Sequence, residues 1–390
     1  MSRSLVGRAL RAKPSVWEQP AGCIAQQQRS FSQTPTHQML SLPDNQVIFD
    51  KTSTPGLAPI LEEIQSSIIL PFYLPIHQRK RVFSEKMKNS LRSDPVYIEV
   101  DGHEHKFSFI DEDSLPASRA ITWKALRAMQ TAEDWNNFGR LLSGMRTAGR
   151  RYSEIDFVKM IRLAGIKGQI YTIIEAARQV RKTGLKLDTS EKVNEILHFV
   201  QMRAANSGWE KEKTEQALRW TEMVLEMLED EKHIPKKNSG VEPSQQMRWP
   251  LHKDPQVLGA ALHLSAVLAV KHNEGKDVDG KVARYATQIV NRWPVDAGLR
   301  QLHPEGAYEN RTSGVAYLIN SRTQYLAAAS PILHGLLLAT RVVDQPTAQK
   351  LQAIANKLGV EVKKEVENNA YPAERGLATY STLFESGKSN

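Results

Sequence analysis

Lysine and arginine are the residues in this 390-residue sequence whose spacing suggests a binding chemistry. Seven of them close two consecutive segments, and a 35-residue step places Arg181 over Arg146 and Lys186 over Arg151. Such a row of cations can neutralise several phosphates, giving RNA affinity that falls steeply with salt and carries no sequence preference. Cations at helix ends also suit a solvated surface, because they interact favourably with the helix dipole. The residues predicted to contact RNA are Arg146, Arg150, Arg151, Arg178, Arg181, Lys182 and Lys186.

A second basic cluster lies nearer the N-terminus. Arg79, Lys80 and Arg81 follow the aromatic pair Phe72 and Tyr73. Basic residues beside exposed aromatic rings suit RNA, because the cations meet phosphates while the rings stack on bases. They also suit a helix that docks on an acidic protein surface. Membrane binding is disfavoured because the apolar face of this segment is short.

The sequence gives little support for a metal site or for an enzymatic activity. His103 and His105 could share one face of a strand and hold a metal, but no third ligand lies close by in the sequence. His263 and His334 occur in apolar segments and are interpreted as core histidines. The sequence contains no nucleotide-binding glycine loop, zinc-protease motif or serine-nucleophile motif. We therefore predict no enzymatic activity, no metal and no cofactor.

Residues 1–31 are typical of a mitochondrial transit peptide. They contain five basic residues, several serines and one acid, Glu18, and they lack the long apolar run of a secretory signal. The sequence Arg29-Ser30-Phe31-Ser32 resembles a matrix-peptidase site, with Phe31 as the last residue removed. A disordered basic tail is the alternative. Cleavage would lower the net charge from +9 to +5 and remove Cys23, the single cysteine. The expected location is the mitochondrial matrix.

No integral membrane insertion is expected. The most apolar runs, Leu258–Val270 and Ala327–Ala339, are each 13 residues long and each contains a histidine. A transmembrane helix needs about 20 apolar residues. We interpret both runs as buried helices.

The elements that position these residues are mainly α-helical. The only strand signal is at 95–110, where Asp101-Gly102 between alternating segments is typical of a β-hairpin. From Pro116 onward, apolar residues recur at intervals of three and four, which indicates helices. Helices are expected at 118–131, 134–147, 154–165, 169–183, 189–205, 212–230, 255–272, 278–292, 313–328, 330–341 and 345–358.

This pattern divides the chain into seven parts. The predicted parts are a transit peptide (1–31), an extended or disordered arm (32–60), a basic helix with the β-hairpin (61–115), helical repeats (116–233), a linker (234–254), a C-terminal helical region (255–360) and a tail (361–390).

The segment Glu154–Asp188 resembles a pentatricopeptide repeat, a unit of 35 residues. It has Phe157 early in the first helix, Gly168 at the turn between helices, and the ending Lys182-Thr183-Gly184-Leu185-Lys186-Leu187-Asp188. Leu187 stands where the family has proline. The preceding segment, 119–153, matches less closely. The resemblance implies a short α-solenoid of stacked helical hairpins, similar to pentatricopeptide and tetratricopeptide repeats.

The resemblance also implies, in many members, single-stranded RNA binding in organelles. In that family a residue near the start of the first helix and the last residue of the unit together read a base. The matching positions are Trp123 with Ser153 and Val158 with Asp188. Trp and Val cannot offer the required hydrogen bond to a base edge. Sequence-specific base reading is therefore not expected.

Two functional hypotheses follow. The first is a non-enzymatic mitochondrial gene-expression protein, either a mitochondrial ribosomal component or an RNA-binding translation or processing factor. Its partners would be mitochondrial rRNA or mRNA together with mitochondrial proteins. The second is a protein-binding scaffold that acts in respiratory-complex assembly. The stacked cations favour RNA, whereas the modest mature charge of +5 and the missing base-reading residues favour the scaffold.

Overall fold

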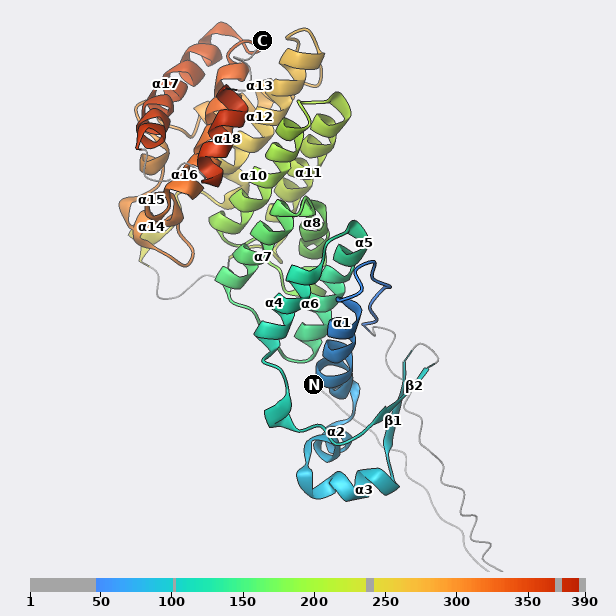
Figure 1. The fold of residues 1–390 in the computed structure, drawn as a ribbon. Helices are drawn as coiled ribbons and strands as arrows, with labels where there is room; N and C mark the ends of the chain where they lie inside the picture. The colour runs from blue at the N-terminus through green and yellow to red at the C-terminus, as the bar shows by residue number, and fades with distance from the viewer. Residues whose placement is uncertain (1–46, 101–102, 236–241, 369–373, 386–390) are drawn as a thin grey trace, which may run out of the picture.

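The protein is an elongated stack of helices with a smaller module at its N-terminal end (Figure 1). The computed structural model describes residues 47–100, 103–235, 242–368 and 374–385. One continuous apolar core runs through the helical stack, and the N-terminal module has a second core of its own. The prediction of a mainly helical protein with a small β-hairpin is confirmed. The predicted transit peptide and residues 32–46 of the predicted arm lie outside the described residues.

The N-terminal module packs two short helices against a β-hairpin. After α1 (Ala58–Ile64), its elements are α2 (Ile76–Phe83), α3 (Lys88–Ser93), β1 (Val96–Val100) and β2 (His103–Phe107). The strands are antiparallel, with Val96 opposite Phe107. The turn residues that predicted the hairpin, 101–102, lie outside the described part of the chain. The module's core consists of Leu70, Leu74, Val82, Leu91, Val96, Ile98, Val100 and Phe107.

Helices α4 to α9 form two consecutive hairpins. Their bounds are α4 Ser118–Ala128, α5 Ala132–Trp135, α6 Asn137–Thr147, α7 Glu154–Ile166, α8 Ile170–Arg178 and α9 Val180–Thr183. Gly149 and Gly184 follow the last helix of each hairpin, with φ of +73° and +78°. This left-handed conformation is the one that glycine adopts at helix C-termini. Two positions 35 residues apart in the sequence therefore have the same backbone geometry.

Polar contacts between successive hairpins join residues that are 37 or 35 positions apart in the sequence. Arg119 on α4 forms an ion pair of 2.6 Å with Asp156 on α7. One hairpin further on, Arg203 donates a hydrogen bond of 3.1 Å to the carbonyl oxygen of Gly168. The first pair is 37 residues apart and the second 35. The stacking of each hairpin on the next is thus fixed by side chains as well as by apolar packing.

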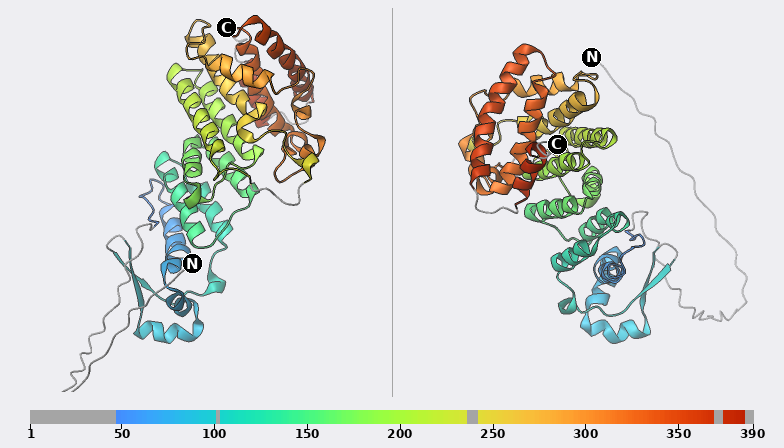
Figure 2. Two further views of the ribbon diagram at one scale, coloured as in Figure 1. Left: turned by 180° about the vertical axis from the view of Figure 1, so that it is seen from behind. Right: turned by 45° about the horizontal axis from the view of Figure 1, so that its top comes forward.

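The C-terminal half wraps longer helices around α12. The helices of this half are α10 Ser190–Asn206, α11 Lys211–Glu229, α12 Pro255–His272, α13 Lys281–Val290, α14 Glu305–Glu309, α15 Tyr317–Asn320, α16 Arg322–Ala339, α17 Gln345–Glu367 and α18 Arg375–Phe384. Helix α12 packs on α16, and α16 contacts α17 and α18 (Figure 2). A Cβ atom at Gly335 would lie 2.7 Å from the Cα of His263, so this glycine allows α16 to approach α12 closely.

The predicted helix boundary near Pro331 is wrong. The sequence predicted separate helices at 313–328 and 330–341, but α16 continues through Pro331. Proline lacks an N–H, so the carbonyl oxygen of Ala327, four residues earlier, loses its helical partner. His198 on α10 replaces that partner, because its Nδ1 lies 3.0 Å from the Ala327 oxygen. A side chain 129 residues away therefore permits a helix that local rules would end.

The end of the chain also differs from the tail expected for 361–390. Helix α17 extends to Glu367, and α18 packs on α16 and α10. Arg375 on α18 donates two hydrogen bonds to Glu195 of α10, one of them 2.7 Å long. Burial would raise the pKa of Glu195, but hydrogen bonds and charges from Arg375 and Arg162 lower it to about 2. This buried ion pair attaches the C-terminal helix to the middle of the stack.

The contact between His198 and the freed carbonyl predicts a thermodynamic coupling. Substitution of His198 by leucine should lower the free energy of unfolding by about 1–3 kcal/mol, because a buried carbonyl is left without a partner. Adding Pro331→Ala should recover about 1 kcal/mol, since the new N–H can bond to that carbonyl. Urea unfolding of the wild type, both single variants and the double variant measures the coupling. Strictly additive effects would contradict this account of α16.

Candidate nucleic-acid interface

The seven cations predicted to contact RNA lie at the ends of two neighbouring hairpins. We call this set the basic stripe: Arg146, Arg150, Arg151, Arg178, Arg181, Lys182 and Lys186. The first three lie at or just beyond the end of α6, and the others at the end of α8, in α9 and in the loop that follows. All are exposed except Lys186, which is half-buried. Helix C-termini favour positive charge because their free carbonyls carry partial negative charge.

The two halves of the basic stripe meet at Gly184. A Cβ atom at this position would lie 2.6 Å from Nη1 of Arg146. The guanidinium of Arg146 therefore extends from the first hairpin to the end of the second, where Arg181 and Lys182 lie. Helix α6 also packs on both α8 and α9. Arg146 of the first hairpin thus contacts the second hairpin at Gly184. The stacking of Arg181 on Arg146 and of Lys186 on Arg151 stays a prediction.

Ion pairing divides the basic stripe into one compensated cation and six free ones. Arg178 pairs with Glu175 at 2.9 Å. The remaining six form no ion pair with any residue that the structure describes. A cation already paired with a carboxylate offers little net charge to a phosphate. The free charge of the stripe is therefore concentrated around Arg146, Arg181 and Lys182 and in the loops beside them.

The loop that carries Lys186 is fixed by a buried histidine. The backbone N–H of Leu187 donates to Nδ1 of His233 at 3.0 Å. Burial lowers the pKa of His233, which keeps the ring neutral and Nδ1 free to accept this bond. Lys186 is thus attached to an ordered segment and its charge has a defined position.

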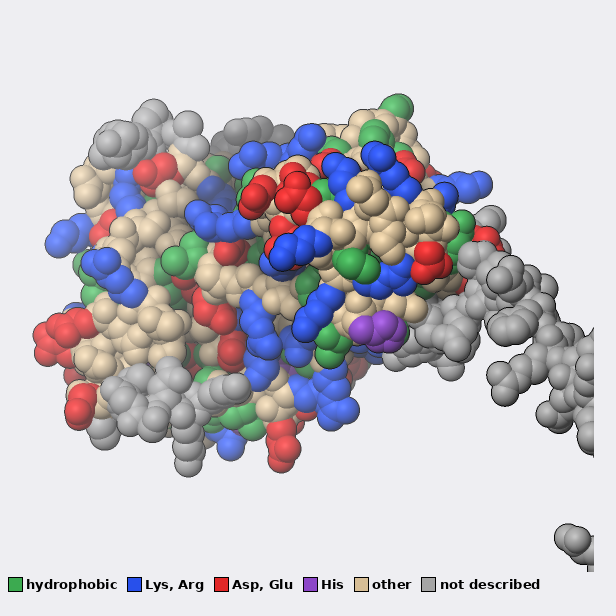
Figure 3. Space-filling model, turned by 90° about the horizontal axis from the view of Figure 1, so that it is seen from below, with side chains coloured by type: hydrophobic (Ala, Val, Ile, Leu, Met, Phe, Trp, Pro, Cys, Tyr) green, Lys and Arg blue, Asp and Glu red, His purple; other side chains and the backbone are tan. Residues whose placement is uncertain are grey.

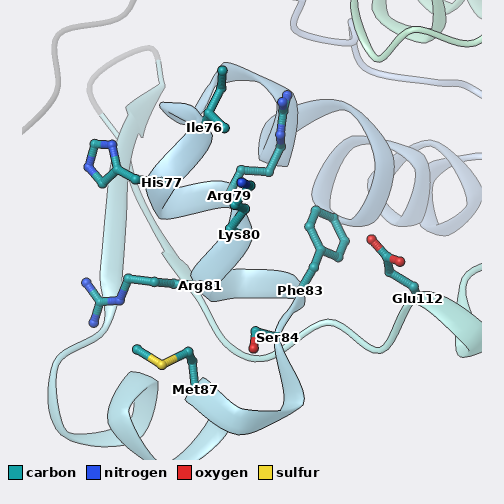
Figure 4. Close-up of a pocket in the computed structure, with 9 residues that line it drawn as sticks. All are labelled: Ile76, His77, Arg79, Lys80, Arg81, Phe83, Ser84, Met87 and Glu112. Carbon is teal, nitrogen blue, oxygen red and sulfur yellow. The ribbon is translucent and has the colours of Figure 1, made fainter.

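The second predicted cluster lies on α2 beside an open hollow of about 620 Å³ (Figure 4). We call Arg79, Lys80 and Arg81 the α2 patch. The guanidinium of Arg79 lies 4.7 Å from the ring centre of Phe72, whereas Arg81 forms an ion pair of 2.9 Å with Asp94. Arg81 therefore joins α2 to the end of α3, and Arg79 and Lys80 remain available to a ligand.

Positive charge is visible across the end of the molecule that carries this module. In the view from below, Lys and Arg side chains gather over the centre of the face, and Asp and Glu side chains lie among and around them (Figure 3). A mixed but predominantly basic surface suits phosphate contacts better than it suits a purely apolar partner.

The positions that would read bases in a pentatricopeptide repeat have structural roles. Ser153 caps α7, since its hydroxyl accepts a hydrogen bond of 3.2 Å from the N–H of Asp156. Val158 is buried, and Asp188 forms an ion pair with the buried Lys192. Trp123 packs partly buried against the core. Capping, core packing and ion pairing therefore occupy Ser153, Val158 and Asp188.

The histidines that the structure describes can be compared with the sequence predictions. Among the described residues, no three His, Cys, Asp or Glu side chains lie close enough together to hold a metal ion. His263 is a buried core histidine, as predicted, whereas His334 is half-buried, and the two bond to each other with a nitrogen–nitrogen distance of 2.8 Å. Across the same part of the chain, no helix has both the length and the apolar composition that crossing a bilayer requires.

Sequence reasoning missed a cation and two aromatic rings at the other edge of the hairpins. The ring of Tyr171 stacks on Trp220 with centroids 5.0 Å apart, and the guanidinium of Arg203 lies 5.2 Å from the Trp220 ring. These residues come from α8, α10 and α11. No local motif marks them, because they become neighbours only when the hairpins stack.

Comparison with known proteins identifies relatives along most of the chain. The family model described as mitochondrial ribosomal protein mS27 matches residues 29–382. The small ribosomal subunit protein mS27 of Neurospora crassa is 34% identical over 348 residues, which cover 86% of this chain and 85% of that protein.

The capping role of Ser153 predicts a result that a base-reading role would not. Substitution of Ser153 by alanine should lower the free energy of unfolding by about 1 kcal/mol, because the first turn of α7 loses its cap. RNA affinity should be the same for oligonucleotides of different sequence. Threonine at this position retains the cap and serves as the control. A change in base preference without a loss of stability would contradict the capping role.

Proposed function

The chain belongs to the mitochondrial ribosomal protein mS27 family, and we propose that it binds ribosomal RNA through the phosphate contacts of its basic stripe. It is a component of the mitochondrial ribosome and is located in the matrix. Of the two hypotheses from the sequence, the ribosomal one is confirmed. The relative from Neurospora is named as a small-subunit protein, and we assign this chain to the same subunit.

The observation that carries the RNA proposal is the group of six free cations that spans two hairpins. The hairpins are stacked by ion pairs and apolar packing, so the spacing between cations is fixed before RNA binds. The backbone positions of these cations are therefore set by the fold, and each contacted phosphate releases counterions. Arg79 and Lys80 of the α2 patch would extend the contact to the N-terminal module.

We propose that RNA recognition by this chain depends on the path of the phosphates and not on base sequence. Ser153, Val158 and Asp188 are occupied by capping, core packing and ion pairing. A protein that stays on one folded RNA needs correct placement, which phosphate contacts supply. It does not need to select one sequence among many.

We also propose that segments 119–153 and 154–188 are two units of a pentatricopeptide-like repeat. Support comes from the shared left-handed glycines at 149 and 184 and from the inter-hairpin ion pair of Arg119 with Asp156. In this proposal the repeat supplies a rigid stack, and its outer edges carry the contacts with RNA and with other ribosomal proteins.

The chain belongs to a ribosomal protein family, and we propose that it has no catalytic role. The buried side chains with lowered pKa values support this. Glu195 binds two arginines, and His198 supplies the missing partner of a helix carbonyl. Each of these polar groups therefore has a structural partner.

Charge reversal of the free cations tests the RNA proposal. The triple variant Arg146→Glu, Arg181→Glu, Lys182→Glu should bind small-subunit ribosomal RNA weakly. Its slope of log affinity against log salt should be shallower by about 2–3, since three phosphate contacts are lost. Arg178→Glu is the matched control and should have a smaller effect, because Arg178 is already paired.

Filter binding at several salt concentrations measures these slopes on purified full-length protein. Circular dichroism of each variant confirms that the helices persist. An unchanged slope in the triple variant would exclude the basic stripe as the RNA contact. In mitochondria, ultraviolet crosslinks of the wild type should lie in ribosomal RNA and should be lost in the triple variant.

A further inference from the structure

A groove of about 550 Å³ lies at the opposite edge of the hairpins from the basic stripe. It is formed by the end of α7, the start of α8, the second half of α10, the start of α11 and one face of α18. Ile170 at the first residue of α8 lines the groove, whereas Arg178 at the last residue of α8 belongs to the basic stripe. The two surfaces are therefore separated by the length of that helix.

The floor of the groove is apolar and preformed. Phe199 lies against α7 where Gly165 leaves room for its ring, since a Cβ atom there would lie 2.2 Å from the ring atoms. The guanidinium of Arg375 covers the same ring at 5.2 Å. Phe199 is thus held between two helices. Met202 and Ile170 complete the apolar lining.

Ile166 is an exposed apolar residue at the rim of this floor. Its exposed fraction is 67%, although it adjoins an apolar hollow. Removing such a side chain from water is favourable, so its burial against a partner would stabilise a complex. An apolar side chain of a partner would cover Ile166 and contact Phe199 at the same time.

The charge of the groove is positive. Its lining contains Arg203, Lys213 and Arg375 and no Asp or Glu. Glu195 forms an ion pair with Arg375, so the charge of Arg375 is compensated. Arg203 bonds only to a carbonyl and a ring face, and Lys213 has no ion pair within the described ranges. Two uncompensated cations therefore flank the apolar floor.

We propose that this groove binds a short acidic peptide segment of a neighbouring protein. Apolar side chains of the segment would contact Phe199 and Ile166, and its carboxylates would pair with Arg203 and Lys213. Charge complementarity and the apolar floor together favour a peptide. Asn206, Ser207, Thr379 and Thr382 also line the groove, and their polar side chains can form hydrogen bonds with the backbone of the segment. The proposal is independent of the RNA contact made by the basic stripe.

Site-specific photocrosslinking in assembled small subunits tests this proposal. A benzoylphenylalanine replacing Ile166 should crosslink to an acidic, apolar segment of one ribosomal protein, identified by mass spectrometry. Ile155 is the matched control, because it lies on the same helix, is 65% exposed and does not line the groove. The same replacement at Ile155 should not yield that product.

Charge-reversal variants show whether the crosslink from position 166 depends on specific binding in the groove or only on a protein that lies nearby. Adding Arg203→Glu and Lys213→Glu should lower the yield of the crosslink at least tenfold. Adding Lys211→Glu and Arg219→Glu, which change exposed cations of α11 outside the groove, should leave the yield unchanged. The slope of RNA binding against salt should stay near the wild-type value in the groove variant, so failure of the two proposals can be distinguished. A crosslink to RNA, to a basic segment or to nothing would overturn the proposal.

Discussion

The arrangement of the other helices depends on the buried polar side chains of helix α10. This helix is surrounded by other helices, so each of these polar groups needs a partner on one of them. Glu195, His198 and Gln201 recur every three residues and are all buried. A buried polar group is destabilising unless it finds a partner. Each of the three finds it on a different helix: Glu195 on α7 and α18, His198 on α16, and Gln201 on α12 through His263. These contacts fix how the hairpin half and the C-terminal half of the stack meet.

Because the faces of the helices are packed against one another in this way, the edges of the stack are what remains for binding partners. The turns and helix ends of the hairpins project from the packed layers, and both candidate surfaces lie there. The basic stripe lies where α6 and α9 end, and the groove that we propose to bind an acidic peptide lies at the start of α8. A rigid α8 between them would hold an RNA and a protein at a fixed separation. That arrangement suits a component that joins parts of a larger particle.

The sequence predicts what depends on local pattern and misses what depends on distant partners. The helical period and the hairpin at 95–110 follow from residues that lie close together in the sequence. The continuous helix through Pro331 does not, because its stabilising histidine is 129 residues away. The ion pair of Arg81 with Asp94 could not be predicted from the sequence either, because it forms only when α3 folds back beside α2. The groove brings together residues from Gly165 to Thr382, which no window of sequence contains.

A basic sequence cluster is an imperfect guide to an RNA site for the same reason. Arg178 and Arg81 belong to runs of cations, yet each forms a short ion pair that holds the fold together. Arg146 has no such acidic partner in the described residues, and its guanidinium extends over Gly184 to the neighbouring hairpin. A phosphate is attracted by charge that the protein has not already compensated. The arginines that matter for binding are therefore those left unpaired after folding, and a structure is needed to identify them.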